Sequence, residues 1–99
     1  MIHDKENSEF LKNARKKIDK TDENIVAAIC ERQKLSLEVA EYKKKNSIDV
    51  YKPKREEEVI ERVRKLAIEH NSNPDLLEEI MKLIMSDSRD IQNKFLDNN

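Results

Sequence analysis

The sequence predicts an all-α fold with three helices per chain, of which the first is long. The 99 residues contain no glycine and only two prolines, Pro53 and Pro74, so the chain lacks the residues on which the turns of hairpins and sheets depend. Apolar residues also recur at helical spacing along most of the chain. A single domain over residues 1–99, with its core from about 9 to 96, is expected because a second domain would have too few residues for its own core.

The first helix is predicted from about Ser8 to about Lys45, since no helix-breaking residue interrupts this segment. At about 1.5 Å per residue, such a helix extends for roughly 55 Å. A helix of this length needs other helices to pack against.

The two prolines mark the starts of the second and third helices. A linker over residues 46–52 leads to Pro53, which suits the first turn of a helix that runs to about His70. A polar break over residues 71–73 follows. Asn73 is predicted to cap the third helix, with Pro74 in its first position and its end near Leu96.

Composition limits the classes of function. Charged residues make up 41% of the chain and apolar residues only 36%, so a single copy is expected to bury a small core that oligomerisation would enlarge. The 20 basic and 21 acidic residues leave no overall cationic surface for nucleic acid or an anionic membrane. No secretory signal or apolar membrane segment is evident, which favours a cytoplasmic protein. Cys30, the only cysteine, is expected to be a buried, reduced thiol.

One face of the first helix is interrupted by polar residues. Nine positions with alternating spacings of three and four share this face, which is called the seam below: Arg15, Ile18, Asp22, Ile25, Ile29, Arg32, Ser36, Val39 and Lys43. Buried cations need anionic partners. The three cations could pair with carboxylates such as Asp22 or Glu56, specify the register of a coiled coil, or bind a small polyanion.

Helix geometry limits which seam cations one ligand could contact. Arg15 and Arg32 lie roughly 25 Å apart along the helix, which is too far for one small molecule, whereas Arg32 and Lys43 lie about 16 Å apart and have long side chains. If two copies of the helix pair antiparallel, the partner subunit's Arg15 comes near the interval between Arg32 and Lys43. Twofold symmetry would then create two equivalent sites.

The other helices also carry polar residues on their apolar faces. On the third helix, Ser88 and Gln92 share a face with Leu77, Met81, Ile84, Ile91 and Phe95. On the second helix, Arg55 and Glu56 continue the stripe of Val59, Ile60 and Val63. Each of these positions alone is best explained by a neighbouring hydrogen-bond partner, but together they describe a cationic, hydrogen-bonding interior.

The spaced set of these segments resembles the all-helical AroQ class (type II) of chorismate mutases. The resemblance covers about Lys12 to Phe95 and rests on RKKIDKTD at 15–22, ER at 31–32, VAEYK at 39–43, PKRE at 53–56, DS at 87–88 and Gln92. It implies an intertwined antiparallel helical homodimer that converts chorismate to prephenate in phenylalanine and tyrosine biosynthesis, a part of the shikimate pathway. It also implies an isomerase that needs no cofactor and no metal.

The resemblance assigns roles to seven residues. Lys43 and Gln92 would contact the ether oxygen of the breaking C–O bond, and Glu56 would contact the ring hydroxyl. The substrate carboxylates would be bound by the remaining four: Arg15 from across the dimer interface, Arg32, Arg55 and Ser88. Of the seven, Lys43, Gln92, Glu56 and Arg32 are the predicted catalytic residues. Lys52 departs from the family pattern, because an acid is common at this position.

Two alternatives stay open at this point, an isochorismate-pyruvate lyase of similar fold and a non-catalytic helical dimerisation module. The protonation of Glu56 also stays open. An apolar enclosure would favour the neutral carboxyl group, whereas neighbouring cations would favour the carboxylate.

Overall fold

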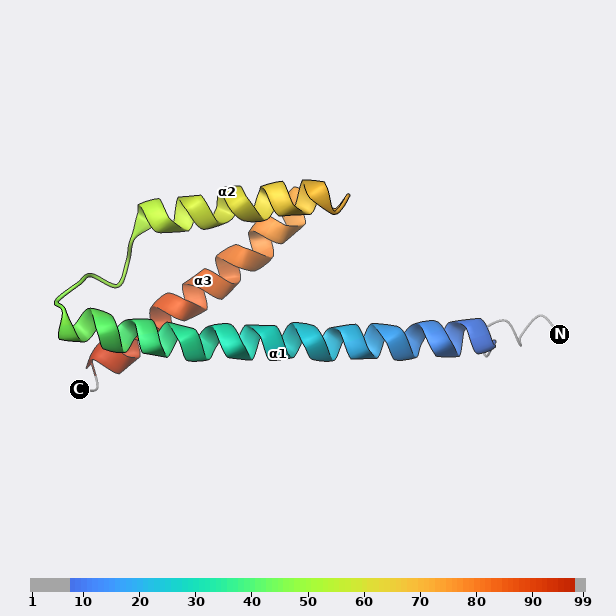
Figure 1. Cartoon of the computed structure of the whole chain (residues 1–99), viewed down its shortest axis with the longest axis horizontal. Helices are drawn as coiled ribbons and strands as arrows, with labels where there is room; N and C mark the ends of the chain where they lie inside the picture. The colour runs from blue at the N-terminus through green and yellow to red at the C-terminus, as the bar shows by residue number, and fades with distance from the viewer. Residues whose placement is uncertain (1–7, 98–99) are drawn as a thin grey trace. The chain divides into compact units, whose positions relative to one another are not determined.

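The computed structural model describes residues 8–97, and within them the chain forms three α-helices and no strand (Figure 1). They are α1 (Glu9–Lys45), α2 (Pro53–Glu69) and α3 (Pro74–Asp97). The predicted all-α, three-helix architecture is confirmed. The ends of all three helices lie within one residue of the predicted positions.

The C-terminal ends of α1 and α2 are each followed by a residue in the left-handed region that is not glycine. Ser47 follows α1 with φ of 54°, and Asn71 follows α2 with φ of 56°. After α1, the amide of Ile48 donates to the carbonyl of Lys43 at 2.9 Å, and the equivalent bond after α2 joins Ser72 to Ala67 at 2.8 Å. This hydrogen-bond pattern is the Schellman motif, which satisfies carbonyl groups left open at a helix end.

The starts of α2 and α3 follow the proline signals. The side-chain Oδ1 of Asn73 accepts hydrogen bonds from the amides of Asp75 at 3.0 Å and Leu76 at 3.4 Å, so the predicted N-cap is confirmed. Pro53 occupies the first turn of α2, and Lys52 before it makes no side-chain capping bond.

The chain divides into two compact units, and the boundary falls inside α1 between Arg32 and Gln33. In the first unit, the described residues form the N-terminal part of α1. Large apolar side chains of this part are exposed, among them Ile18 at 57% and Ile25 at 52%.

Cys30, on the same part of α1, is also exposed, so the prediction of a buried thiol is wrong for the single chain. A lone helix covers a side chain only with neighbours three or four residues away, which is too little to bury one.

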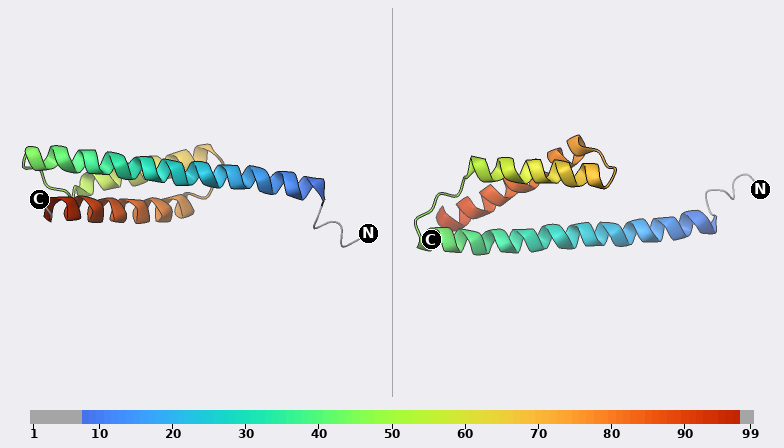
Figure 2. Two further views of the ribbon diagram at one scale, coloured as in Figure 1. Left: turned by 90° about the horizontal axis from the view of Figure 1, so that it is seen from below. Right: turned by 45° about the horizontal axis from the view of Figure 1, so that its top comes forward.

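The second unit contains the last turns of α1 together with α2 and α3. The guanidinium of Arg64 on α2 pairs with Asp75 and Glu78 at the start of α3, at 2.9 and 3.0 Å. Glu56, at the start of α2, pairs with Arg89 near the end of α3. These contacts run in opposite directions along the two helices, so α2 and α3 form an antiparallel hairpin, as Figure 2 also shows.

The last turns of α1 pack beside the C-terminal half of α3. The Ser36 hydroxyl donates to Ser88, and the Lys44 ammonium lies 5.6 Å from the centre of the Phe95 ring. Both pairs advance in the same direction, so this part of α1 runs parallel to α3 (Figure 2). The buried apolar residues of the described chain are few and come from all three helices: Ala40, Val59, Ala67 and Met85.

No helix within residues 8–97 combines the length and the apolar character that spanning a bilayer requires.

Candidate functional site

Lys43 is a partly buried cation at the end of α1. Its Nζ donates a hydrogen bond to the carbonyl oxygen of Val50 at 2.9 Å, and its own carbonyl accepts the bond from Ile48 that closes the helix. Burial and, to a smaller extent, the positive charge of Lys52 lower the pKa of Lys43 from its ordinary value.

No carboxylate within residues 8–97 pairs with Lys43, so the ion pairs considered from the sequence are not formed at this position. A partly buried ammonium whose hydrogen bond goes to a neutral carbonyl is favourably placed to bind an anion or a negatively polarised oxygen.

Ser36 and Ser88 form a buried hydrogen-bonded pair between α1 and α3. The Ser36 hydroxyl donates to Ser88 Oγ at 3.2 Å, and the Ser88 hydroxyl donates back to the Ile84 carbonyl at 3.0 Å. The two side chains are only 7% and 8% exposed. One turn before Ser36, Gln33 Nε2 also donates to Asp87 Oδ2 at 3.2 Å. The expectation that Ser88 points into the interior and needs a partner there is confirmed.

Gln92 lies one turn beyond Ser88 on the same face of α3. It is 8% exposed, and its Oε1 has no hydrogen-bond partner among the described residues. A buried polar atom without a partner costs about 1–3 kcal/mol. This oxygen therefore calls for a hydrogen-bond donor from outside the described residues, such as a water molecule or a ligand group.

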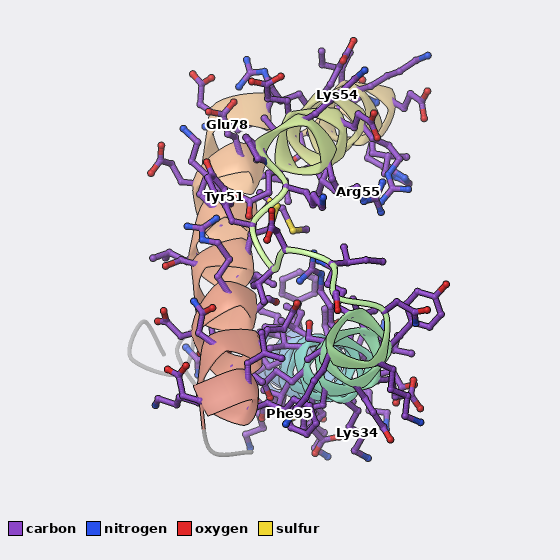
Figure 3. The ribbon with its side chains drawn as sticks, turned by 90° about the vertical axis from the view of Figure 1, so that its left-hand side faces the viewer. Lys34, Tyr51, Lys54, Arg55, Glu78 and Phe95 are labelled. Carbon is purple, nitrogen blue, oxygen red and sulfur yellow. The ribbon has the colours of Figure 1, made fainter. Side chains whose placement is uncertain are left out.

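Glu56 is held by a residue that sequence reasoning did not identify. Arg89 on α3 donates from one guanidinium nitrogen to both carboxylate oxygens of Glu56, and its guanidinium carbon lies 5.2 Å from the centre of the Tyr51 ring. The hydrogen bonds to Glu56 raise the pKa of Arg89 above its ordinary value. Figure 3 shows Tyr51 beside α3. Glu56 and Arg89 are 33 positions apart on different helices, so no local spacing could have linked them.

A hollow of about 490 Å³ opens beside this pair. Residues of α2, α3 and the linker line it, among them Tyr51, Glu56, Ile60, Lys82 and Met85. Glu56 is the only residue of the predicted site in this lining. The hollow therefore adjoins the predicted site at Glu56 and does not contain its other members.

The three predicted arginines lie at more open positions. Arg55 is exposed and pairs with Glu58 one turn along α2, at 3.8 Å, and in Figure 3 its side chain projects away from α3. Arg15 is exposed and Arg32 half-buried, and both belong to the first unit. The second unit thus contains five of the seven predicted residues: Lys43, Arg55, Glu56, Ser88 and Gln92.

Together, the helices and these side chains define a class of protein. It is a small all-α protein that presents a partly buried ammonium, buried hydroxyl groups and a buried amide oxygen without a described partner. These groups suit a small, polar, anionic molecule more than a macromolecule.

Comparisons with known proteins specify the family within that class. A model of the chorismate mutase type II family matches residues 14–93. The chorismate mutase of Methanocaldococcus jannaschii is 35% identical over 89 residues, which are 90% of each chain. The chain belongs to the chorismate mutase type II family and is an isomerase, so the resemblance noted in the sequence is confirmed.

Two longer relatives match as well. The bifunctional chorismate mutase/prephenate dehydratase of Aquifex aeolicus is 40% identical over 58 residues, and that of Buchnera aphidicola subsp. Schizaphis graminum is 31% identical over 93 residues. The matching regions are 16% and 24% of those proteins. The similarity therefore concerns one part of each bifunctional relative.

Proposed function

We propose that the protein converts chorismate to prephenate, in the biosynthesis of phenylalanine and tyrosine, at two equivalent sites of a homodimer. The observation that carries this proposal is Lys43, a partly buried ammonium at the end of α1 that no described carboxylate neutralises. A cytoplasmic location stays a prediction from the sequence.

The reaction is an intramolecular Claisen rearrangement, in which the ether C–O bond breaks as a new C–C bond forms within one molecule. Both reacting fragments are already joined, so the enzyme needs no nucleophile. It has to confine the flexible enolpyruvyl arm in the reactive geometry and to stabilise the negative charge that develops on the ether oxygen.

Lys43 and Gln92 are the proposed donors to the ether oxygen. Because the charge on this oxygen grows towards the transition state, donors aimed at it bind the transition state more tightly than the substrate. The ammonium of Lys43, which no described carboxylate neutralises, supports its role. The donor of Gln92 would be its Nε2 group, whereas the atom that lacks a described partner, Oε1, is an acceptor.

The two substrate carboxylates are the proposed ligands of a set of cations and one hydroxyl. Arg32 and Arg55 would act within the chain, together with the buried hydroxyl of Ser88. Arg15 would reach the site of the other subunit, since it lies too far along α1 to share a small ligand with its own Lys43. Glu56 would contact the ring hydroxyl. Fixing both carboxylates supplies the confinement that the rearrangement requires.

Exposed apolar residues on α1 support the homodimer. Ile18, Ile25 and Val39 of the seam are between 44% and 57% exposed in the single chain. Burying such residues on antiparallel pairing would add apolar contact area to a chain with a small core. The dimer would thereby complete both the fold and the two sites.

The proposal is tested by adding purified protein to chorismate without cofactor and following the loss of chorismate absorbance. The product should be prephenate, identified by its conversion to phenylpyruvate in acid. In Lys43→Ala we expect the rate to fall about a hundredfold or more, because one donor to a developing oxyanion contributes on the order of 3 kcal/mol.

Lys45→Ala is the matched control. Lys45 lies at the same helix end but is exposed and pairs with Glu41 at 3.8 Å, so its loss should leave the rate nearly unchanged. A folded protein that leaves chorismate intact would contradict the proposal. Pyruvate release from isochorismate would then identify a lyase, and inactivity on both substrates a dimerisation module.

A further inference from the structure

The hollow beside the α2–α3 hairpin has the size of a small-molecule site. Its volume of about 490 Å³ lies within the range of about 300–1,000 Å³ that such sites occupy. Arg55 of the predicted site lies two positions before the lining residue Glu57, and therefore on another side of α2. In Figure 3 the Arg55 side chain projects away from α3. One stripe of α2, with members three or four positions apart, lines the hollow: Glu57, Ile60, Glu61 and Arg64.

The bottom of the hollow is apolar. Met85 of α3 is only 5% exposed, and Ile60 of α2 is half-buried. Tyr51 of the linker, which is 55% exposed, adds an aromatic side chain to the lining. A ring placed on these side chains would be removed from water, which favours binding in proportion to the apolar area that is buried. The bottom therefore fits a ligand with an apolar ring.

Two carboxylates beside this apolar surface lack a cation. Glu57 and Glu61 are one turn apart on α2 and exposed, and neither forms an ion pair with another residue in the range 8–97. Like charges at this spacing repel each other. The third acid of the lining, Glu56, is already paired with Arg89. An ammonium group of a ligand would therefore compensate Glu57 and Glu61.

Two cations of the lining retain donors for an anionic group. Arg64 contacts Asp75 and Glu78 through one guanidinium nitrogen, Nη1, so its Nε and Nη2 groups donate to no described residue. Lys82 pairs with Glu78 at 2.8 Å, and its side chain is 55% exposed. An ammonium has three donors. Both cations can therefore also donate to a carboxylate of a ligand.

We propose that this hollow is a binding site for an α-amino acid with an aromatic side chain. The ring lies on the apolar bottom, and the ammonium group binds Glu57 and Glu61. The carboxylate binds Arg64 and Lys82. Glu61 and Arg64 are neighbours at a spacing of three residues, so acidic and basic groups adjoin, as the two charges on one carbon atom of an amino acid require. Binding here goes beyond the proposed function and can be measured without chorismate.

The first test follows binding to the unmodified protein by NMR. Phenylalanine is added to ¹⁵N-labelled protein, and the shifts of the assigned backbone amides are recorded. We expect saturable changes, with a Kd below about 10 mM, that are largest over residues 57–64 and 82–85. The absence of saturation, or changes confined to the surroundings of Lys43 and Gln92, would overturn the proposal.

Three analogues of phenylalanine test the three contacts separately. Phenethylamine lacks the carboxylate, 3-phenylpropionate lacks the ammonium group, and alanine lacks the ring. Each should bind about fivefold or more weakly than phenylalanine, because each loses one set of contacts. An analogue that bound as tightly as phenylalanine would contradict the contact assigned to the missing group.

Glu61→Gln tests the acidic side of the hollow, and Glu69→Gln is its matched control. Both residues are exposed on α2 and both substitutions remove one negative charge, but Glu69 does not line the hollow. We expect Glu61→Gln to bind phenylalanine about fivefold or more weakly, and 3-phenylpropionate no more weakly than the unmodified protein does. Equal phenylalanine affinity in the two variants would refute the site.

Discussion

The two parts of α1 carry the same sequence pattern but differ in burial. In the last turns, over residues 33–45, Ser36 and Ala40 are buried, and they are the only buried residues of the described helix. Over residues 9–32 no residue is buried, and the seam residues Ile18 and Ile25 are more than half exposed. The three-four spacing predicts that one face of a helix is to be covered, but it does not say whether the same chain or a second copy covers it.

The difference assigns distinct tasks to the two parts. The last turns pack on α3 and position Lys43 and Ser36 through contacts within the chain. The first part presents an apolar face and Arg15, which in the proposed homodimer would act on the partner subunit.

The largest expected effect comes from placing a charge on the first part of the seam. In Ile25→Asp, the twofold symmetry of the proposed homodimer would bring two unpaired carboxylates into its interface, where burying a charge costs several kcal/mol. We expect dissociation into monomers and a loss of more than about a thousandfold in activity at micromolar concentration. Sedimentation measures the association state, and chorismate consumption measures the rate.

Lys20→Asp is the control for this substitution. The Lys20 side chain is 72% exposed and lies off the seam, so the variant should stay dimeric and active. A dimeric, active Ile25→Asp protein would contradict the use of this face as an interface.

The next largest effect is expected from Gln92, on the face of α3 that packs against the last turns of α1. Gln92→Met replaces a buried amide, whose Oε1 has no described partner, by an apolar side chain of similar shape. We expect kcat to fall about a hundredfold, while the free energy of unfolding rises by about 1 kcal/mol because the unsatisfied group is removed. Urea denaturation and steady-state kinetics measure the two changes.

Ser88→Ala should show the opposite change in stability, since Ser88 is hydrogen-bonded to Ser36 and Ile84. A Gln92→Met protein that is less stable than the unmodified one would indicate that the Gln92 amide is satisfied within the fold.

Mixed dimers test whether the two parts of α1 act in different subunits. Arg15→Ala and Lys43→Ala homodimers should each be nearly inactive. After equal amounts are unfolded together and refolded, half of the dimers are mixed, and each mixed dimer has one site with both side chains intact. Activity should return to about a quarter of the unmodified level. No recovery would mean that Arg15 acts in its own subunit.

The smallest effect is a pH dependence that belongs to Lys43 alone. Burial and the charge of Lys52 lower the pKa of Lys43, and the protonated form is the active one. Activity should therefore fall as the pH rises, at a lower pH than an ordinary lysine would require. In Lys52→Gln, one of the two causes is removed, so this decline should move to higher pH, with a gain of a few-fold in kcat on the alkaline side. An unchanged alkaline decline would show that Lys52 does not act on Lys43.

Sequence reasoning identified the elements whose causes are local. Asn73, Pro53 and Pro74 predicted the starts of α3 and α2, because caps and first-turn prolines act within a few residues. The left-handed residues Ser47 and Asn71 were not identified. The chain has no glycine to mark these positions, and Asn71, a residue type that tolerates this conformation, was assigned only to a polar break. The expected burial of Cys30 was wrong for the single chain, because apolar context does not reveal what covers a helix face.

The sequence by itself determined the three helices, their ends and the seam of α1, because helical hydrogen bonds and side-chain spacing connect residues that are four or fewer positions apart. It also showed the family, through a spaced set of charged and amide residues. Only the tertiary structure decided that Arg89 pairs with Glu56 and lies against the Tyr51 ring, and that Ser36 pairs with Ser88. The physical reason is distance along the chain: these partners are brought together by helix packing, which depends on the shapes of whole faces and not on the spacing of any two residues.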